Sequence, residues 1–335
     1  KYTYGRGESV NENLGWESKA ELNLGLDFSF FDGRLYGKAD VFRRKISSML
    51  FYVQVPNPPF IRGYQWQNIG LLENKGWEFE LGGDIIRSKD FKWSSSVNLS
   101  HSASKVLSID GSSTRWDGGQ LPGPNSTGKA IILEEGSTVG QFYLFEFAGF
   151  SKSGQFLIKD RNGKTIPASS KVANDKKLLG NFTPKMMYGW NHTFSYKDLD
   201  LGVSMHGWLG FDVYNTYAMC LGIARRNGEC NVLRDAYSTF SHIKDEKLMS
   251  DYYLEEGSFL KIDAITLGYR LDISRWTKYV DYLRIYATCG NVATFTGYTG
   301  LDPEVNIIGY DGGVDDYTKA YPMTRTWTLG VQLKF

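Results

Sequence analysis

The last nine residues alternate between apolar side chains and polar or small ones. Trp327, Leu329, Val331, Leu333 and Phe335 share one side of an extended strand, and the residues between them are Thr, Gly, Gln or Lys. A strand of this kind that ends on an aromatic residue is typical of the closing strand of an outer-membrane β-barrel, where one side meets lipid and the other meets a wet lumen. Because any half-buried antiparallel strand also alternates, the interpretation depends on how often the chain repeats the pattern.

The alternation recurs in eight further segments, which form four consecutive pairs with short turns. The paired segments are 20–30 with 35–41, 77–85 with 91–99, 188–196 with 199–211, and 258–271 with 282–291. Along 259–269 the apolar side changes face, which predicts a β-bulge near Asp263 and Ala264. The apolar side predicts lipid-facing residues that include, besides the terminal stripe, Leu22, Leu24, Leu26, Leu201 and Val203. The polar side predicts lumen-facing carboxylates at Glu78, Glu80, Asp84, Asp200 and Asp212.

The connections between these segments are of two lengths. Turns near 31–33, 87–90, 197–198 and 272–281 are short, whereas 46–74, 104–183, 212–256 and 292–323 are long. Short turns on the periplasmic rim and long loops outside are the organisation of an outer-membrane barrel, and a soluble sandwich gives no reason for this asymmetry. With alternating strand directions, the segment 104–183 is either an external elaboration or holds two extra strands. The chain therefore supplies nine or eleven strands.

Composition agrees with this interpretation without establishing it. Aromatic residues make up 15% of the chain, with 37 Gly and 9 Pro, and a soluble all-β protein would fit as well. The net charge is +1, with no block of basic residues, so nucleic acid is not an expected partner. No segment approaches the ~18 uninterrupted apolar residues of a spanning helix. Residues 1–6 lack an apolar signal-peptide core, so we expect a processed chain or one that begins partway through a longer polypeptide.

The cysteine and histidine positions indicate no metal site. Cys220 and Cys230 lie ten residues apart and could form a disulfide across a loop in an oxidising compartment, whereas Cys289 lies in a strand pattern and is expected to act as a small apolar residue. The four histidines have no ligand spacing and no pair of CxxC units is present, so neither a metal nor a cofactor is expected. An Asp160–Gly163 segment lacks the downstream glutamate of an EF-hand and instead predicts a type I′ turn at Asn162 and Gly163.

Several segments resemble one family in their order along the chain. Residues 11–17, Asn-Glu-Asn-Leu-Gly-Trp-Glu, and then 30–35, Phe-Phe-Asp-Gly-Arg-Leu, are similar to a motif of SusC/RagA-type TonB-dependent outer-membrane transporters. Further agreeing segments are 68–78, 179–181 with 184–185, 256–262, 268–269, 298–304 and 321–322. The resemblance covers nearly the whole chain but only the carboxyl-terminal third of such a transporter.

The resemblance implies more than the periodicity shows. Members of this family are plugged barrels of about 22 strands, which import oligosaccharides or peptides with energy passed on by TonB. A SusD-like lipoprotein closes the extracellular mouth as a lid. We therefore expect residues 1–335 to form part of an all-β antiparallel transmembrane barrel in the outer membrane of a Gram-negative cell. The plug domain and the TonB-contacting segment belong to the amino-terminal part of such proteins and are absent from this chain, which alone should not transport.

Function is then expected in the long loops. Their aromatic residues could stack on sugar faces or pack against a lid protein, although anchoring of the loops or a place in the interfacial girdle is the simpler role for each of them. The candidates are Tyr64, Trp66, Trp116, Tyr214, Tyr252 and Tyr253. No catalytic set of residues is evident, so an enzyme is not expected. An energised nutrient transporter is the favoured hypothesis; a barrel enzyme or adhesin and a structural component of an envelope assembly are the alternatives.

Overall fold

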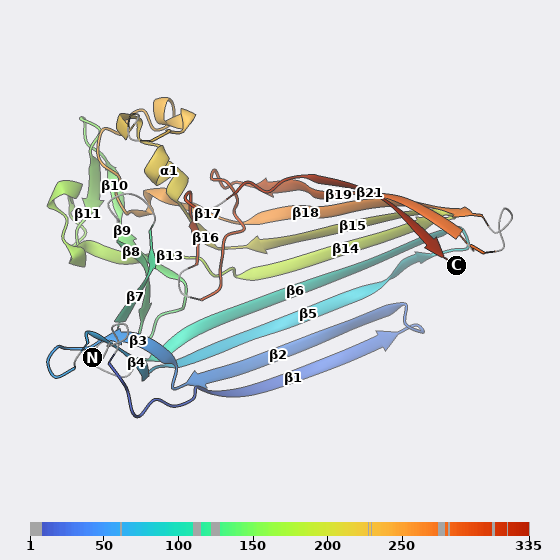
Figure 1. Cartoon of the computed structure of the whole chain (residues 1–335), viewed down its shortest axis with the longest axis horizontal. Helices are drawn as coiled ribbons and strands as arrows, with labels where there is room; N and C mark the ends of the chain where they lie inside the picture. Colours follow the sequence, from blue (N-terminus) through green and yellow to red (C-terminus); the bar gives the residue numbers. More distant parts are fainter. Residues whose placement is uncertain are drawn as a thin grey trace, which may run out of the picture.

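The chain folds into one long antiparallel sheet and a cap of short elements at one end of it (Figure 1). The computed structural model describes residues 9–60, 62–109, 115–121, 128–226, 228, 230–273, 279–280, 282–309, 312–319 and 321–334. The long connections lie at the cap end and the short turns at the opposite end, as the sequence predicts.

Nine strands form the long sheet, each antiparallel to its neighbours. In order across the sheet they are β1 (Ser18–Phe30), β2 (Leu35–Ser47), β5 (Leu71–Arg87), β6 (Phe91–Ser108), β14 (Met186–Tyr196), β15 (Leu199–Leu209), β18 (Phe259–Asp272), β19 (Tyr282–Thr296) and β21 (Thr326–Lys334). The strands between β6 and β14 belong to other sheets. Of the two expected strand numbers, nine is therefore confirmed for the described residues, and the segment between β6 and β14 is an elaboration outside the wall, although its expected start at residue 104 still belongs to β6.

The register aligns the apolar residues of all nine strands on one face, here called the outer face. Leu329 lies opposite Ala287, and the row continues through Leu267 and Leu201 to Phe194. Leu329 is 84% exposed and Leu24 is 71% exposed, so the rest of the chain does not cover this face. A compact sandwich would bury such residues.

The predicted lipid-facing residues lie on this face. Leu22, Leu26, Trp327, Val331 and Leu333 are all exposed, and Val203 lies one row from Leu201. Phe335 lies outside the described residues. Aromatic side chains gather on the outer face towards the short turns, as in the interfacial belt of a membrane barrel. They are Phe28, Phe30, Trp93, Phe194, Tyr196 and Tyr269.

The opposite face, here called the inner face, is mostly polar and faces the cap. Trp208 and Phe259, on the inner face of β15 and β18, pack with Phe211, Val213 and Tyr298 of the cap. Because extracellular loops fold over the lumen of a barrel, this contact identifies the inner face as the lumenal one.

The predicted irregularity in β18 is present. The pairing of β18 with β19 shifts between Ile262 and Ala264, so Asp263 is an extra residue and the apolar side chains change parity there. The first short turn uses three consecutive residues with positive φ, namely Phe31, Asp32 and Gly33. The turn expected at 272–281 lies partly outside the described residues.

Among the residues that the structure describes, the cap consists of four small sheets and short helices. The hairpin is β3 (Leu50–Gln54) with β4 (Tyr64–Asn68), and a four-stranded sheet holds β7 (Arg115–Gln120), β8 (Lys129–Glu134), β9 (Gln141–Phe145) and β13 (Lys176–Asn181). Two three-stranded sheets hold β10 (Phe147–Phe150), β11 (Phe156–Lys159) and β12 (Thr165–Pro167), and β16 (Asp212–Asn215), β17 (Leu254–Glu256) and β20 (Val314–Asp315). The helices are α1 (Thr216–Leu221) and the 3₁₀ turns Ala168–Ser170, Ala173–Asp175, Ala224–Arg226, Arg234–Tyr237 and Asp251–Tyr253. No helix in the described part of the chain has the length and apolar character to span a membrane.

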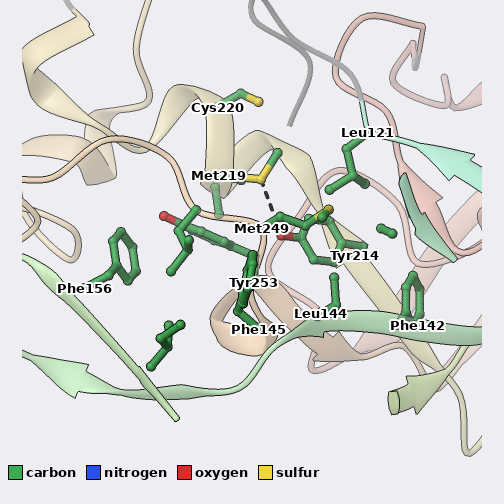
Figure 2. Packing of buried hydrophobic residues seen from close by; sticks show 14 of the residues in the cluster. Leu121, Phe142, Leu144, Phe145, Phe156, Tyr214, Met219, Cys220, Met249 and Tyr253 are labelled. Carbon is green, nitrogen blue, oxygen red and sulfur yellow. Dashed lines mark hydrogen bonds between the residues drawn. The ribbon is translucent and has the colours of Figure 1, made fainter. Parts of the chain in front are cut away.

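The hydrophobic core of the molecule lies in the cap and not against the long sheet. Phe142, Phe156, Tyr214, Met219 and Tyr253 are 0–1% exposed and come from five different cap elements (Figure 2). The Tyr214 hydroxyl donates a hydrogen bond to Met219 Sδ at 3.4 Å. Cys220 belongs to this core, and within the described residues no disulfide joins it to Cys230, so the possible bridge is not formed.

Candidate functional site

The lumenal wall carries paired charges. Arg284 of β19 donates from Nε to Asp200 Oδ1 at 2.9 Å and from Nη2 to Asp200 Oδ2 at 2.5 Å. Both side chains cross Gly268, where a Cβ atom would lie only 2.5 Å from the guanidinium, so glycine leaves the space for this pair. Asp84 accepts a hydrogen bond from Ser94 Oγ at 2.7 Å. On the lumenal face, Asp200 thereby links β15 to β19, and Asp84 links β5 to β6.

Glu78 and Glu80 also lie on the inner face of β5. Glu78 is opposite Ser100 of β6, and Glu80 is opposite Lys38 of β2. These positions agree with the lumenal placement that the alternation predicts for Glu78, Glu80, Asp84 and Asp200. Asp212 requires a correction, because it lies beyond the end of β15, in cap strand β16, and not on the wall.

An ion cluster joins the wall to the loop after β19. Lys261 of β18 is almost buried, and its ammonium lies 2.9 Å from Asp302 Oδ1 and 2.5 Å from Glu304 Oε2. His206 of β15 adds a second contact, with Nδ1 at 2.7 Å from Asp263, the bulge residue. Asp302 and Glu304, within the family-like segment 298–304, therefore anchor this loop to the lumenal wall.

A second polar network fixes the same loop to the cap. Tyr298 donates from its hydroxyl to Asp315 Oδ2 at 2.9 Å, and Leu301 N donates to the same oxygen at 3.0 Å. Asp315 is 3% exposed, and this burial raises the pKa of its carboxyl. Burial and the adjacent carboxylate also raise the pKa of Tyr298. The loop is thus held at both ends and presents a fixed surface over the lumen.

A polar crevice of about 530 Å³ lies where the cap meets the end of the wall. Its lining includes His101, Asn181, Lys185, Asp212 and Glu256. Asp212 Oδ2 accepts the Asn181 N–H at 2.8 Å. Burial raises the pKa of the Asp212 carboxyl, and the nearby Glu256 adds to this rise. Amide, carboxyl and ammonium groups at one place can bind a hydroxylated or amide-bearing solute by hydrogen bonds.

The hairpin β3–β4 carries a second candidate surface, here called the aromatic face, which consists of Tyr52, Tyr64 and Trp66. The ring of Tyr52 stacks on Tyr64 with 5.2 Å between centroids and lies 5.2 Å from Trp66. The other side of the hairpin buries Phe51 and Gln65 against the cap. Tyr64 is 45% and Trp66 42% exposed, so two broad rings face solvent on a hairpin held from behind.

Two of the predicted loop contacts have to be corrected. Tyr214 and Tyr253 are 0% and 1% exposed and form part of the cap core, because their rings fill the space between its sheets (Figure 2). Tyr252 is partly buried and packs 4.8 Å from Phe147 between ring centroids, so it borders that core. Trp116 lies in β7, and its side chain is outside the described residues.

Other parts of the site carried weak sequence signals or none. Tyr52 could have been found as the third aromatic residue of a short hairpin, whereas Lys261 lies 41 residues from Asp302 and nothing in the sequence pairs them. The type I′ turn predicted at Asn162 is wrong. Gly163 has positive φ but Asn162 is not among the residues that do, because Asp160 Oδ1 accepts the N–H groups of Asn162 and Lys164 and holds a different turn. Among the described residues, no group of His, Cys, Asp and Glu side chains could hold a metal ion.

Comparisons with known proteins agree with this architecture. Residues 2–292 match the family model described as TonB dependent receptor-like, beta-barrel. The chain is 31% identical to TonB-dependent receptor P3 of Formosa agariphila, over 97% of this chain and 35% of that protein. It is also 31% identical to TonB-dependent receptor SusC of Bacteroides thetaiotaomicron, over 100% of this chain and 33% of that protein. The chain thus spans about a third of the length of these relatives.

Solved structures show the same fold. The RagAB peptide importer in its closed-closed state superposes with a TM-score of 0.77 at 25% identity, over 97% of this chain and 36% of that one. The open-open state gives a TM-score of 0.77 at 24% identity, over 100% of this chain and 37% of that one. With the exposed apolar face, the polar lumenal face and the match over 2–292, the chain belongs to the TonB-dependent receptor-like β-barrel family of the outer membrane.

Proposed function

We propose that this chain forms part of the barrel wall and of the extracellular mouth of a transporter that imports oligosaccharides or peptides in a TonB-dependent manner. The plug and the TonB-contacting segment would come from the amino-terminal side of the same protein. Two findings support this proposal. The chain matches the family model, and it aligns with about a third of the length of each of its relatives. In this role the chain binds and passes a solute and does not transform it chemically.

The single observation that carries the proposal is the position of the polar crevice and the aromatic face. Both lie at the long-loop end of a sheet whose outer face is apolar, so a solute that reaches them has arrived from outside the cell. A carbohydrate can stack on flat rings and hydrogen-bond to carboxylates and amides, and an extended peptide can use the same groups.

We also propose that a SusD-like lipoprotein covers this mouth. Similarity to the proteins named SusC and RagAB supports a lid of this kind. An interface commonly uses exposed Tyr and Trp rings as anchors, and Tyr64 and Trp66 are such rings on a rigid hairpin. The same rings could serve solute or lid, and the two uses give different results in a binding experiment.

The test is solute uptake by cells that carry the full-length receptor with Trp66→Ala. We expect uptake of peptides or oligosaccharides to fall by about fivefold or more, because loss of an aromatic anchor commonly weakens binding by over 1 kcal/mol. Purification of the same variant shows whether the lid lipoprotein is lost with it or is retained while the solute is lost.

Tyr237→Ala is the matched control, since Tyr237 is a 58% exposed aromatic residue elsewhere on the cap. Uptake should remain near the wild-type level in this variant. A full-length receptor that supports no uptake of any peptide or oligosaccharide, and that copurifies with no lipoprotein, would contradict the proposal and favour a structural or adhesive barrel.

A further inference from the structure

The outer face has a hollow near the short-turn end of β2, β5 and β6. It encloses about 520 Å³ and is lined mainly by Leu35, Leu81, Ile85, Ser95 and Val97. Leu35, Gly83 and Ser95 lie opposite one another in adjacent strands, with Leu81 and Val97 in the next row, all on the outer face. The hollow therefore opens towards the bilayer and not towards the lumen.

Small residues create the hollow. Gly83 and Ser95 lie side by side where neighbouring rows carry leucine, valine or tryptophan. A side chain at Gly83 would meet the carbonyl oxygen of Arg34 at 2.4 Å, so the close approach of the β1–β2 turn requires glycine at this position. Leu35, Leu81 and Val97 around these two residues are half-buried and form the sides of the hollow.

A cation lies at the rim of this hollow. Arg34 lines it from the β1–β2 turn and is exposed. Its Nη2 atom reaches the Asp84 carbonyl oxygen only at 3.5 Å, and in the described part of the chain no carboxylate lies within ion-pair distance of Arg34. Phe31, 75% exposed, lies beside it in the same turn, at the level of the aromatic belt where headgroups meet acyl chains.

We infer that this hollow is a binding site for a glycerophospholipid of the periplasmic leaflet. Short turns face the periplasm in outer-membrane barrels, so the rim lies at the headgroups of that leaflet. One acyl chain would occupy the space between Leu81 and Val97, and the guanidinium of Arg34 would bind the phosphate through paired N–H donors. The apolar lining, the bilayer-facing opening and the cation at headgroup level together select a lipid.

Photo-crosslinking of the full-length receptor tests this inference. The receptor is placed in nanodiscs of phosphatidylethanolamine and phosphatidylglycerol that contain a phospholipid with a diazirine on its acyl chain, and labelled peptides are mapped by mass spectrometry. We expect labelling to concentrate on residues 81–97 rather than on the outer face of β18 and β19. Equal labelling of all outer-face strands would overturn the inference, because it describes an unselective lipid ring.

Two variants separate the site from the general lipid contact. Ser95→Phe fills the hollow and should abolish the local enrichment, whereas Ala287→Phe adds the same ring to the outer face of β19 and should leave it unchanged. Arg34→Gln should lower the enrichment by about tenfold, the value of one strong charge-assisted hydrogen bond. Arg270→Gln removes a charge from the inner face at the short-turn end of β18, away from the hollow, and is its control. Enrichment that survives both Ser95→Phe and Arg34→Gln would contradict the assignment.

Discussion

The wall and the cap place their apolar residues in opposite ways. In the cap, Leu144 and Phe142 are completely buried among other apolar side chains, whereas Leu329 and Trp327 of the wall are 84% and 75% exposed. The cap is therefore organised as a water-soluble domain, with its apolar residues inside. The wall satisfies its backbone hydrogen bonds within the sheet and presents apolar side chains outward, which is stable only in lipid. The two regions of the chain thus place their apolar residues differently, because the cap folds in water and the wall folds in lipid.

The largest expected difference between the two regions is the response to the loss of an apolar side chain. Leu144→Ala should destabilise the cap by about 2–5 kcal/mol, because it leaves a cavity in a packed core. Leu329→Ala should change stability by less than about 1 kcal/mol, since lipid chains can fill the space. Denaturant unfolding of the full-length receptor in nanodiscs measures both, and similar losses at the two sites would mean that the two regions share one solvent.

A charge should produce the second largest effect, and only on the wall face that meets lipid. Leu329→Arg should lower stability or membrane assembly by about 2–4 kcal/mol, the penalty for arginine at the midplane of a barrel. Gln332→Arg places the same charge on the inner face, opposite Arg284, and should be tolerated much better. The amount of folded protein in isolated outer membranes is the measurement, and equal tolerance would refute the assignment of faces.

Loss of the Lys261 anchor should have an intermediate effect at the boundary between wall and cap. Lys261→Met leaves Asp302 and Glu304 without their cation, and because these carboxylates are 25% and 34% exposed the expected loss is about 1–2 kcal/mol. Hydrogen exchange over residues 299–306 should increase. Lys319 is the control, since it is 82% exposed and pairs with Asp316. Lys319→Met should change stability by less than about 1 kcal/mol. Unchanged exchange in Lys261→Met would show that the cluster does not hold the loop.

The smallest effects concern pH and have opposite signs at two cap carboxylates. Lys159 and Lys177 lower the pKa of Glu146, so the stability that this group contributes is present above its usual pKa and is lost as pH falls through the lowered value. Glu146→Gln should then be less stable than wild type at pH 7 and equal to it in strong acid.

Asp212 supplies the matched opposite case. Burial raises its pKa, so the ionised form destabilises the folded cap once pH rises above the usual value. Asp212→Asn should be slightly more stable than wild type at pH 7, and the difference should disappear in acid. Thermal unfolding of both variants between pH 3 and pH 7 tests the signs, and the same sign at the two positions would contradict the electrostatic account.

The wall could be predicted from sequence because its signal is local. A strand with one face in lipid and one in water alternates at every residue, so the nine strands, the bulge at Asp263 and the faces of Leu329 and Asp200 all follow from adjacent positions. The family resemblance supplied the rest of the wall's interpretation, and the match over residues 2–292 confirmed it.

The cap could not be predicted in the same way, because its contacts join distant segments. Tyr214 and Tyr253 lie in the long connection 212–256, where the sequence predicts surface contacts, but segments from other parts of the chain pack over them. The Lys261 cluster and the crevice at Asp212 depend on side chains that are tens of residues apart. The hollow at Gly83 arises from a single close backbone approach, for which a pair of glycines in a strand is only a weak signal.

The outer face of the long sheet lies in lipid and the inner face in water. Spin labels at positions 329 and 332 of the full-length receptor, with every native cysteine replaced by serine, test it directly in reconstituted bilayers. We expect the label at 329 to be relaxed by oxygen dissolved in the bilayer, and the label at 332 to be relaxed by a water-soluble nickel complex. A label at 329 that is reached by the nickel complex as readily as the label at 332 would contradict it.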